Sequence, residues 1–173
     1  LLALLRYHGG EPEEAYRLGE QALALHQAAG DRSAEAQTLF RLGDARRSQR
    51  RLDECEGFYR KSLDVRHEIG DRMGEAHSLH GLGVIAAERN RNEESEMLLD
   101  SAFRLERELG LRRLQAMTLN SLGIMAFRRR DFAAAEARLN ESMEIHRALG
   151  SEQSVAFALA NLGDVARARG QLE

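Results

Sequence analysis

An eight-residue stretch of the chain, TLFRLGDA at residues 38–45, recurs with constant spacing. Its copies are SLHGLGVI at 78–85, TLNSLGIM at 118–125 and ALANLGDV at 158–165, so each begins 40 residues after the previous one. A second series of glycines stands at 30, 70, 110 and 150, again 40 residues apart. Two glycine series that share one period indicate a tandem repeat of a single structural element.

The repeat sets the organisation of the 173-residue chain. Full repeats cover 31–70, 71–110 and 111–150, residues 1–30 match the last three quarters of a repeat, and residues 151–173 match its first half. We therefore expect a single domain over 1–173 with about four repeats. We also expect it to be a fragment of a longer repeat protein.

Each repeat has the pattern of two helices. Leu39 and Leu42 lie three residues apart, as do their copies, and therefore share one helical face. We predict first helices over 33–49, 73–89, 113–129 and 152–169, and second helices over 11–29, 52–69, 92–109 and 131–149. The glycines at 30, 70, 110 and 150 are expected to end the second helices in a left-handed turn. Asp31 and Asp71 follow such glycines and are expected to cap the next helix.

Composition and charge disfavour several classes of protein. Hydrophobic residues make up 43% and charged residues 31% of the chain, which favours a globular protein over a disordered one. The net charge of −3 disfavours a basic nucleic-acid-binding domain. No apolar run reaches the roughly 18 residues of a membrane span. The single cysteine, Cys55, excludes an internal disulfide and a four-cysteine zinc site.

Small residues indicate where the two helices of a repeat approach each other. Each small residue in a first helix is followed, twelve positions later, by a second small residue in the next helix. The pairs are Ala3–Ala15, Gly43–Cys55, Gly83–Ser95 and Gly123–Ala135. A second small column consists of Ala22, Ser62, Ala102 and Ser142. We interpret Cys55 as a small core residue. A reactive thiol is the alternative, but no neighbouring base is specified.

Arginines gather at the ends of the first helices, and carboxylates open the second helices. Examples are Arg46 and Arg47 before Asp53 and Glu54. Positive charges near the ends of helices and negative charges near their starts interact favourably with the helix dipole. We interpret the arginine run at 128–130 in the same way, with nucleic-acid binding as the alternative.

These residues together resemble the tetratricopeptide repeat family. The shared features are Leu42-Gly43 in the first helix, Cys55 and Ser62 in the second, and their copies. The departures are leucines such as Leu39 in place of the family's Trp, the set Arg46, Ala86, Ala126 and Ala166 in place of its Tyr, and a missing final Pro. The repeat is longer than the family's roughly 34-residue unit. It is similar to the long repeats of kinesin light chains, Leu-Gly-Asn spindle adaptors and the arms of bacterial regulators. The resemblance implies an all-α, right-handed superhelical solenoid of antiparallel helix pairs.

The resemblance also implies that the first helices line a concave face that binds a peptide or a partner protein. Its inward positions would be Gln37, Phe40, Arg41, Asp44, Arg47, His77, His80, Val84, Met117, Asn120, Ile124, Phe127, Phe157, Asn161, Asp164 and Arg167. Phe40, Phe127 and Phe157 are expected to receive apolar anchors. Arg41, Arg47 and Arg167 are expected to pair with acidic groups. The alternative for the apolar members is packing between repeats.

Asparagine immediately before Leu-Gly often holds the ligand backbone in long-repeat relatives. Only Asn161 matches this feature, because Arg41, Gly81 and Ser121 occupy the other three places. The resemblance therefore does not imply a regular asparagine ladder along the first helices.

Enzyme and metal hypotheses have little support in the sequence. His77 and His80 share a helical face, but Glu88 is distant and no third ligand has a fixed spacing. No phosphate-binding loop occurs, and the glycine pair at 81 and 83 lies inside a helix. We therefore expect no enzymatic activity, no metal and no cofactor. We also expect no membrane association and no direct nucleic-acid binding.

The function predicted from the sequence is a non-catalytic scaffold, the sensory or interaction arm of a larger cytoplasmic regulator. The 25 basic residues include one lysine, Lys61, a bias typical of GC-rich genomes and therefore of a bacterium. The alternatives are a small-ligand sensor of a transcriptional regulator and a structural spacer or oligomerisation element. Leu159 and Leu162 lie in a first helix without a second helix after it, so we expect exposure there and end-to-end self-association.

Overall fold

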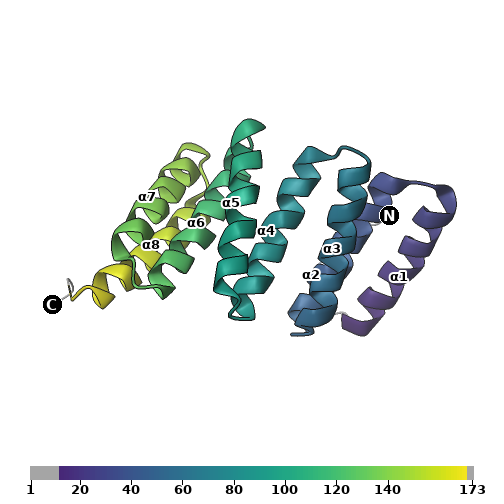
Figure 1. Cartoon of the computed structure of the whole chain (residues 1–173), viewed down its shortest axis with the longest axis horizontal. Coiled ribbons are helices and arrows are strands. Elements are labelled where there is room, and N and C mark those ends of the chain that lie inside the picture. Colours follow the sequence, from purple (N-terminus) through teal and green to yellow (C-terminus); the bar gives the residue numbers. More distant parts are fainter. Residues whose placement is uncertain (1–11, 171–173) are drawn as a thin grey trace. The chain divides into compact units, whose positions relative to one another are not determined.

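The structure, a computed structural model, describes residues 12–170, which form eight α-helices and no strand within that range. The first helices of the repeats are α2 (Arg32–Ser48), α4 (Arg72–Glu88), α6 (Arg112–Arg128) and α8 (Glu152–Ala168) (Figure 1). The second helices are α1 (Pro12–Ala29), α3 (Leu52–Glu68), α5 (Asn92–Glu108) and α7 (Phe132–Ala148). The predicted helices are confirmed, with bounds that agree to within one residue.

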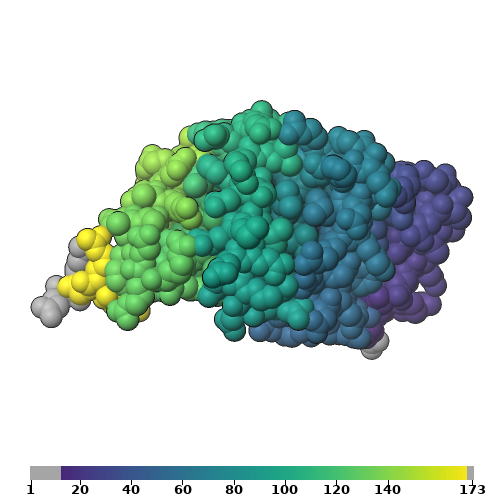
Figure 2. Space-filling model, in the orientation of Figure 1, coloured from purple at the N-terminus to yellow at the C-terminus, as the bar shows by residue number. Residues whose placement is uncertain are grey.

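The helices form two compact parts, and the division between them falls within α4. The N-terminal part ends at Ser78, and the C-terminal part begins at Leu79. In the N-terminal part α2 packs against α1 and α3, and in the C-terminal part α6 packs against α5 and α7 while α8 packs against α7. Side chains fill the spaces between neighbouring helices of each part (Figure 2). The consecutive helices α1, α2 and α3 of the N-terminal part, and α5 to α8 of the C-terminal part, therefore pack one against the next, which is the expected arrangement of helix pairs.

Left-handed residues end the helices of both kinds. Gly30, Gly70, Gly110 and Gly150 have φ between 67° and 69°, which confirms the predicted turns. The first helices α2, α4 and α6 end the same way without glycine, at Arg50 (φ 62°), Asn90 (φ 60°) and Arg130 (φ 64°). The sequence did not predict these, because a left-handed turn was expected only at glycine.

Aspartates cap the starts of three helices. Asp31 Oδ1 accepts a hydrogen bond from Ala34 N at 3.0 Å, and Asp71 Oδ1 accepts one from Gly74 N at 2.9 Å. Both predicted caps are thus confirmed. Asp131 caps α7 in the same way, through Ala134 N at 3.1 Å. Each cap satisfies a backbone donor that the helix itself leaves unpaired.

The small residues lie where paired helices approach. A Cβ placed on Gly43 would lie 2.6 Å from the Tyr59 ring and 3.3 Å from the Cys55 carbonyl oxygen. A Cβ placed on Gly123 would lie 2.7 Å from Leu139 Cγ. Cys55 is fully buried, which confirms its position in the core. Ala3, the partner predicted for Ala15, lies outside the described residues.

Candidate functional site

Polar contacts join the first helices of the C-terminal part side by side. Asn161 Nδ2 on α8 donates to Asn120 Oδ1 on α6 at 2.9 Å. His80 Nε2 on α4 and Ser121 Oγ on α6 lie 3.3 Å apart. Both pairs span 41 positions, so equivalent sides of successive first helices meet. We call the surface that carries His80, Asn120 and Asn161 the first-helix face.

The Asn120–Asn161 pair presents a hydrogen-bond donor beside an acceptor. Both side chains are half-buried. Within residues 12–170, neither side chain forms a hydrogen bond other than the one that joins them. Asn120 Nδ2 can therefore still donate, and Asn161 Oδ1 can still accept. A peptide group offers the complementary acceptor and donor, so the pair can hold a segment of extended backbone.

Two exposed apolar side chains lie beside this pair. Met117 precedes Asn120 by one helical turn, and Phe157 precedes Asn161 by one turn, so each shares the face of its asparagine. Phe157 is 64% exposed and Met117 is 38% exposed. Large apolar groups beside unsatisfied amides combine the two properties by which a surface binds a peptide.

The other predicted residues of the C-terminal part are less available. Phe127 packs against the buried cluster that contains Ala126 and Leu139, and its ring centroid lies 6.1 Å from that of Phe132. Asp164 and Arg167 are exposed but pair with each other at 2.9 Å. Val84 and Ile124 are half-buried. The accessible binding groups of this part therefore concentrate around the asparagine pair.

Phe40 in the N-terminal part lies between two other rings. Its centroid is 4.5 Å from that of Tyr59 and 4.5 Å from that of His77, and only 9% of the residue is exposed. The structure thus gives Phe40 a packing role, and its service as an apolar anchor stays a prediction. Gln37, Arg41, Asp44 and Arg47 are exposed.

Burial also sets the protonation of the groups around Phe40. Burial lowers the pKa of His77, and the nearby Arg66 lowers it further, while Asp44 opposes the shift. Burial raises the pKa of Tyr59, and its hydrogen bond to Asp44 adds to that effect. His77 and Tyr59 are therefore both uncharged at neutral pH, which suits their contact with the apolar Phe40 ring.

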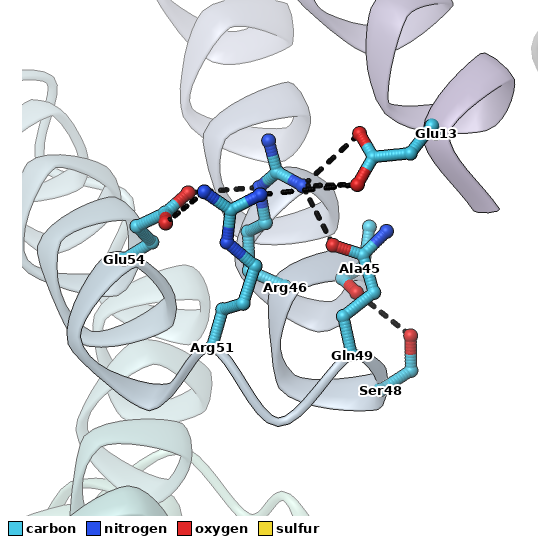
Figure 3. A network of polar contacts seen from close by, with 7 residues as sticks. All are labelled: Glu13, Ala45, Arg46, Ser48, Gln49, Arg51 and Glu54. Atoms are coloured by element: carbon cyan, nitrogen blue, oxygen red, sulfur yellow. Dashed lines mark hydrogen bonds and ion pairs between the residues drawn. The ribbon is translucent and has the colours of Figure 1, made fainter.

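A buried arginine network in the N-terminal part was not predicted from the sequence. Arg46 is only 5% exposed, and its guanidinium carbon lies 3.3 Å from the centroid of the Tyr16 ring. It forms ion pairs with Glu13 at 3.2 Å and with Glu54 at 3.0 Å. Figure 3 shows Arg46 and Arg51 between these two carboxylates. The network joins α1, α2 and α3, so it fixes the helices that carry the exposed residues of this part.

The arginine run at 128–130 is engaged within the chain. Arg128 Nη1 donates to the Ala87 carbonyl oxygen at 2.9 Å, and Arg129 pairs with Glu96. The guanidinium carbon of Arg130 lies 5.9 Å from the centroid of the Phe132 ring. These contacts favour the structural interpretation of the run over nucleic-acid binding.

The described residues offer no metal cluster and no membrane span. Within 12–170, no group of three or more His, Cys, Asp or Glu residues could hold a metal ion. Over the same range, every helix is too short or too polar to cross a membrane.

Comparison with known proteins identifies the family. The sequence matches the family model of the tetratricopeptide repeat over residues 35–108 and 114–173. No curated protein matches it. The crystal structure of BtubC (BKLC) from P. vanneervenii is similar with a TM-score of 0.83 at 22% identity, over 94% of this chain and 68% of that one.

Two further solved structures are similar at lower identity. The apo form of RapI has a TM-score of 0.77 at 15% identity, over 91% of this chain and 43% of that one. A putative kinesin light chain from Podosopora anserina with nearly identical TPR-like repeats has a TM-score of 0.73 at 15% identity, over 93% of this chain and 80% of that one. At these identities the likeness shows the fold alone, and it confirms the all-α arrangement of helix pairs. The chain belongs to the tetratricopeptide repeat family.

Proposed function

We propose that the chain is a non-catalytic scaffold that binds an extended segment of a partner protein on its first-helix face. Tetratricopeptide repeats generally mediate interactions between proteins. The observation that carries the proposal is the Asn120–Asn161 pair, with its remaining donor and acceptor, beside exposed Met117 and Phe157. In the bound state, a ligand carbonyl accepts from Asn120 Nδ2, and a ligand N–H donates to Asn161 Oδ1.

Apolar groups beside the pair, and charged groups on the N-terminal part, would each add affinity for a partner. An apolar ligand side chain placed over Phe157 and Met117 would remove exposed apolar surface from water, worth roughly 1.5–3 kcal/mol for a full side chain. Taken by itself, the N-terminal part presents exposed Arg41 and Arg47, which would attract acidic side chains of a partner, with Gln37 as a further polar contact.

We further propose that the chain serves as the interaction arm of a larger cytoplasmic regulatory protein from a bacterium. The arginine-rich, lysine-poor composition supports the bacterial origin. The fold shared with BtubC and RapI, of which this chain covers 68% and 43% of the length, fits a module within a larger protein.

Peptides selected from a random displayed library test the proposal. Their dissociation constants would be measured by fluorescence anisotropy against the parent chain and single variants. Asn161→Ala removes one acceptor and is expected to weaken binding roughly fivefold, since a lost hydrogen bond costs about 1 kcal/mol. Phe157→Ala is expected to weaken binding further. Met97→Ala is the matched control, because Met97 is 71% exposed but lies on the second helix α5.

The outcomes separate the proposed function from its alternatives. Loss of binding in the Asn161 and Phe157 variants, with Met97→Ala unchanged, supports the first-helix face. Equal affinity for all variants contradicts it. Failure to select any peptide also contradicts it and favours a spacer or a small-ligand sensor. The double variant Phe127→Ala with Arg167→Glu then shows whether the outer positions of the face take part.

A further inference from the structure

A buried carboxyl group joins the end of α5 to the first turns of α6. Glu106 is 0% exposed, and its Oε1 accepts a hydrogen bond from Thr118 Oγ1 at 2.8 Å. Gln115 Nε2 on the same helix donates to the Glu106 backbone oxygen at 3.0 Å. Gln115 and Thr118 are buried as well. We call Glu106, Gln115 and Thr118 the α5–α6 latch.

The second carboxyl oxygen of Glu106 makes the latch depend on a proton. Oε2 is buried and has no hydrogen-bond partner within residues 12–170. Burying a charged carboxylate without a counter-ion costs much more free energy than burying a neutral carboxyl group. The closed latch therefore favours the protonated form of Glu106. Loss of the proton favours any opening of α5 and α6 that lets water reach Oε2.

The charged side chains of the neighbouring helices give Glu106 no counter-ion. In the C-terminal part, α5 packs against α6 and forms a hydrogen bond with the second half of α4. The charged and titratable side chains that these two helices contribute to this part are His80, Glu88, Arg112, Arg113 and Arg128. Within the described residues, none of them forms an ion pair with Glu106. On α5 itself, the next residues, Arg107 and Glu108, are exposed. Burial raises the pKa of Glu106 to about 7, and the Thr118 hydrogen bond opposes this shift.

We propose that the α5–α6 latch is a pH-sensitive switch, closed while Glu106 holds its proton and opening more often once the proton has left. Opening separates the last turn of α5 from the first turns of α6. Met117 and Asn120 of the first-helix face stand on either side of Thr118 in the sequence, so opening also displaces them. Partner affinity then falls with the fraction of closed chains. This consequence for affinity rests on the proposed function, whereas the latch itself does not.

His146 on α7, 40 positions after Glu106, provides an internal control of opposite sign. Burial lowers the pKa of His146, and the nearby Arg113 lowers it further. An open state of α7 would therefore bind a proton more readily than the closed state, and opening is favoured as the pH falls. The direction of the pH effect consequently distinguishes α7 from the α5–α6 latch.

Hydrogen exchange between pH 5 and pH 8, corrected for the intrinsic pH dependence of amide exchange, tests the latch. Glu106 has a pKa of about 7 in the closed chain, against 4.5 when it is free. Opening at residues 105–118 is therefore expected to increase by up to about tenfold per pH unit between these values, and to level off above them. Glu106→Gln should abolish the increase, and Glu108→Gln, at an exposed position of α5, should leave it unchanged. Thr118→Val removes the donor to Oε1, so the increase should level off at a higher pH.

The outcomes separate the latch from a general loss of stability. Exchange in the parent chain that does not depend on pH, or a dependence that persists in Glu106→Gln, would overturn the proposal. An equal increase with pH in the amides of α7 would also overturn it, because Glu106 would then act on global unfolding alone.

The affinity of a selected peptide, measured from pH 6 to pH 8, tests the consequence for binding. It is expected to fall in the parent chain and to stay constant in Glu106→Gln. Exchange that responds to pH while affinity does not would overturn the coupling to the first-helix face. If no peptide can be selected, the proposed function fails, and the exchange experiment still decides on the latch.

Discussion

Arg66 in the N-terminal part and Glu106 in the C-terminal part occupy the same position of the repeat and carry opposite charges. They are 5% and 0% exposed. Arg66 Nη1 donates to the Gly74 carbonyl oxygen at 2.5 Å and lies 3.3 Å from Ser78 Oγ. Glu106 Oε1 accepts from Thr118 Oγ1 at 2.8 Å, but its Oε2 has no hydrogen-bond partner within residues 12–170.

This difference separates what the repeat determines from what it leaves open. Ser78 and Thr118 also share a repeat position, so the register decides which side chains meet. The chemistry of each pair decides whether a buried charge is satisfied. Burial lowers the pKa of Arg66, with Asp71 opposing the shift. Burial raises the pKa of Glu106 to about 7, with the Thr118 hydrogen bond opposing it.

A second repeat position shows the same contrast. Arg46 is buried among Tyr16, Glu13 and Glu54 in the N-terminal part. Ala126 occupies the position in the C-terminal part and is fully buried in an apolar cluster. The N-terminal part thus uses ion pairs and a cation–π contact where the C-terminal part uses apolar packing.

The largest expected effect concerns the proton of Glu106. Its pKa is about 7 in the folded chain, against 4.5 for the free side chain. Between these two pH values the unfolded chain loses the proton while the folded chain keeps it. The free energy of unfolding therefore falls as pH rises through this window, by up to about 3 kcal/mol. Glu106→Gln removes the penalty and is expected to stabilise the chain at pH 8 but hardly at pH 4.

Urea unfolding at several pH values, followed by circular dichroism, measures this difference. Glu108→Gln, at an exposed position on the same helix, is the control. A stabilisation by Glu106→Gln that is the same at pH 4 and pH 8 would contradict the buried, shifted carboxyl.

The next effect tests the arginine network of the N-terminal part. Arg46→Ala removes two ion pairs and the cation–π contact with Tyr16, and is expected to destabilise the chain by about 2 kcal/mol. Arg41→Ala, at an exposed position of the same helix, is expected to change stability by less than about 0.5 kcal/mol. Chemical denaturation of both variants measures the difference. Equal effects would mean that the buried network contributes nothing beyond an exposed arginine.

A smaller effect compares the two kinds of left-handed turn. Arg130→Gly replaces a residue with φ 64° by one that adopts this conformation freely. It is expected to stabilise the chain by about 1 kcal/mol. Gly110→Ala, at φ 68° after a second helix, is expected to destabilise it by about the same amount. Thermal unfolding gives both values, and shifts of the same sign would contradict the argument.

The smallest effect concerns the exposed ion pairs of the C-terminal part. Arg129→Ala breaks the pair with Glu96, and is expected to lower stability by less than about 1 kcal/mol. The loss should shrink in high salt, because salt screens exposed charges. A loss of stability larger than this, and unchanged by salt, would contradict the prediction. It would mean that this pair stabilises the chain as much as the Arg46 network does.

The helices and most of their ends could be predicted from the sequence. The periodic leucines indicate the buried face of each helix, and the periodic glycines indicate left-handed turns. Gly43 and Cys55 marked a helix approach, and the capping aspartates followed the left-handed glycines. The left-handed Arg50 and Arg130 were missed because their side chains give no signal for this conformation. The available signal was that both stand a whole number of repeats before Gly170 (φ 72°), Arg130 one repeat and Arg50 three repeats before it.

The accessibility of the predicted binding residues could be foreseen only in part. The resemblance pointed to the first helices, where Asn161 and Phe157 are accessible, and their role in binding stays a prediction. It could not indicate that Tyr59 and His77 cover Phe40, because ring stacking depends on side-chain packing between helices. The buried charges were also missed, since a charged residue in an amphipathic pattern is normally assigned to the surface. The alanines that share the repeat position of Arg46 were the available signal for its burial.

Hydrogen exchange of the chain with and without a selected peptide tests the central claim most directly. The peptide would be one from the library that binds the parent chain and not the Asn161→Ala variant. The first-helix face predicts slower exchange in α6 and α8 on binding, with α5 and α7 little changed at the same occupancy. Protection confined to the second helices would contradict the proposed face, as would protection of no helix at full occupancy.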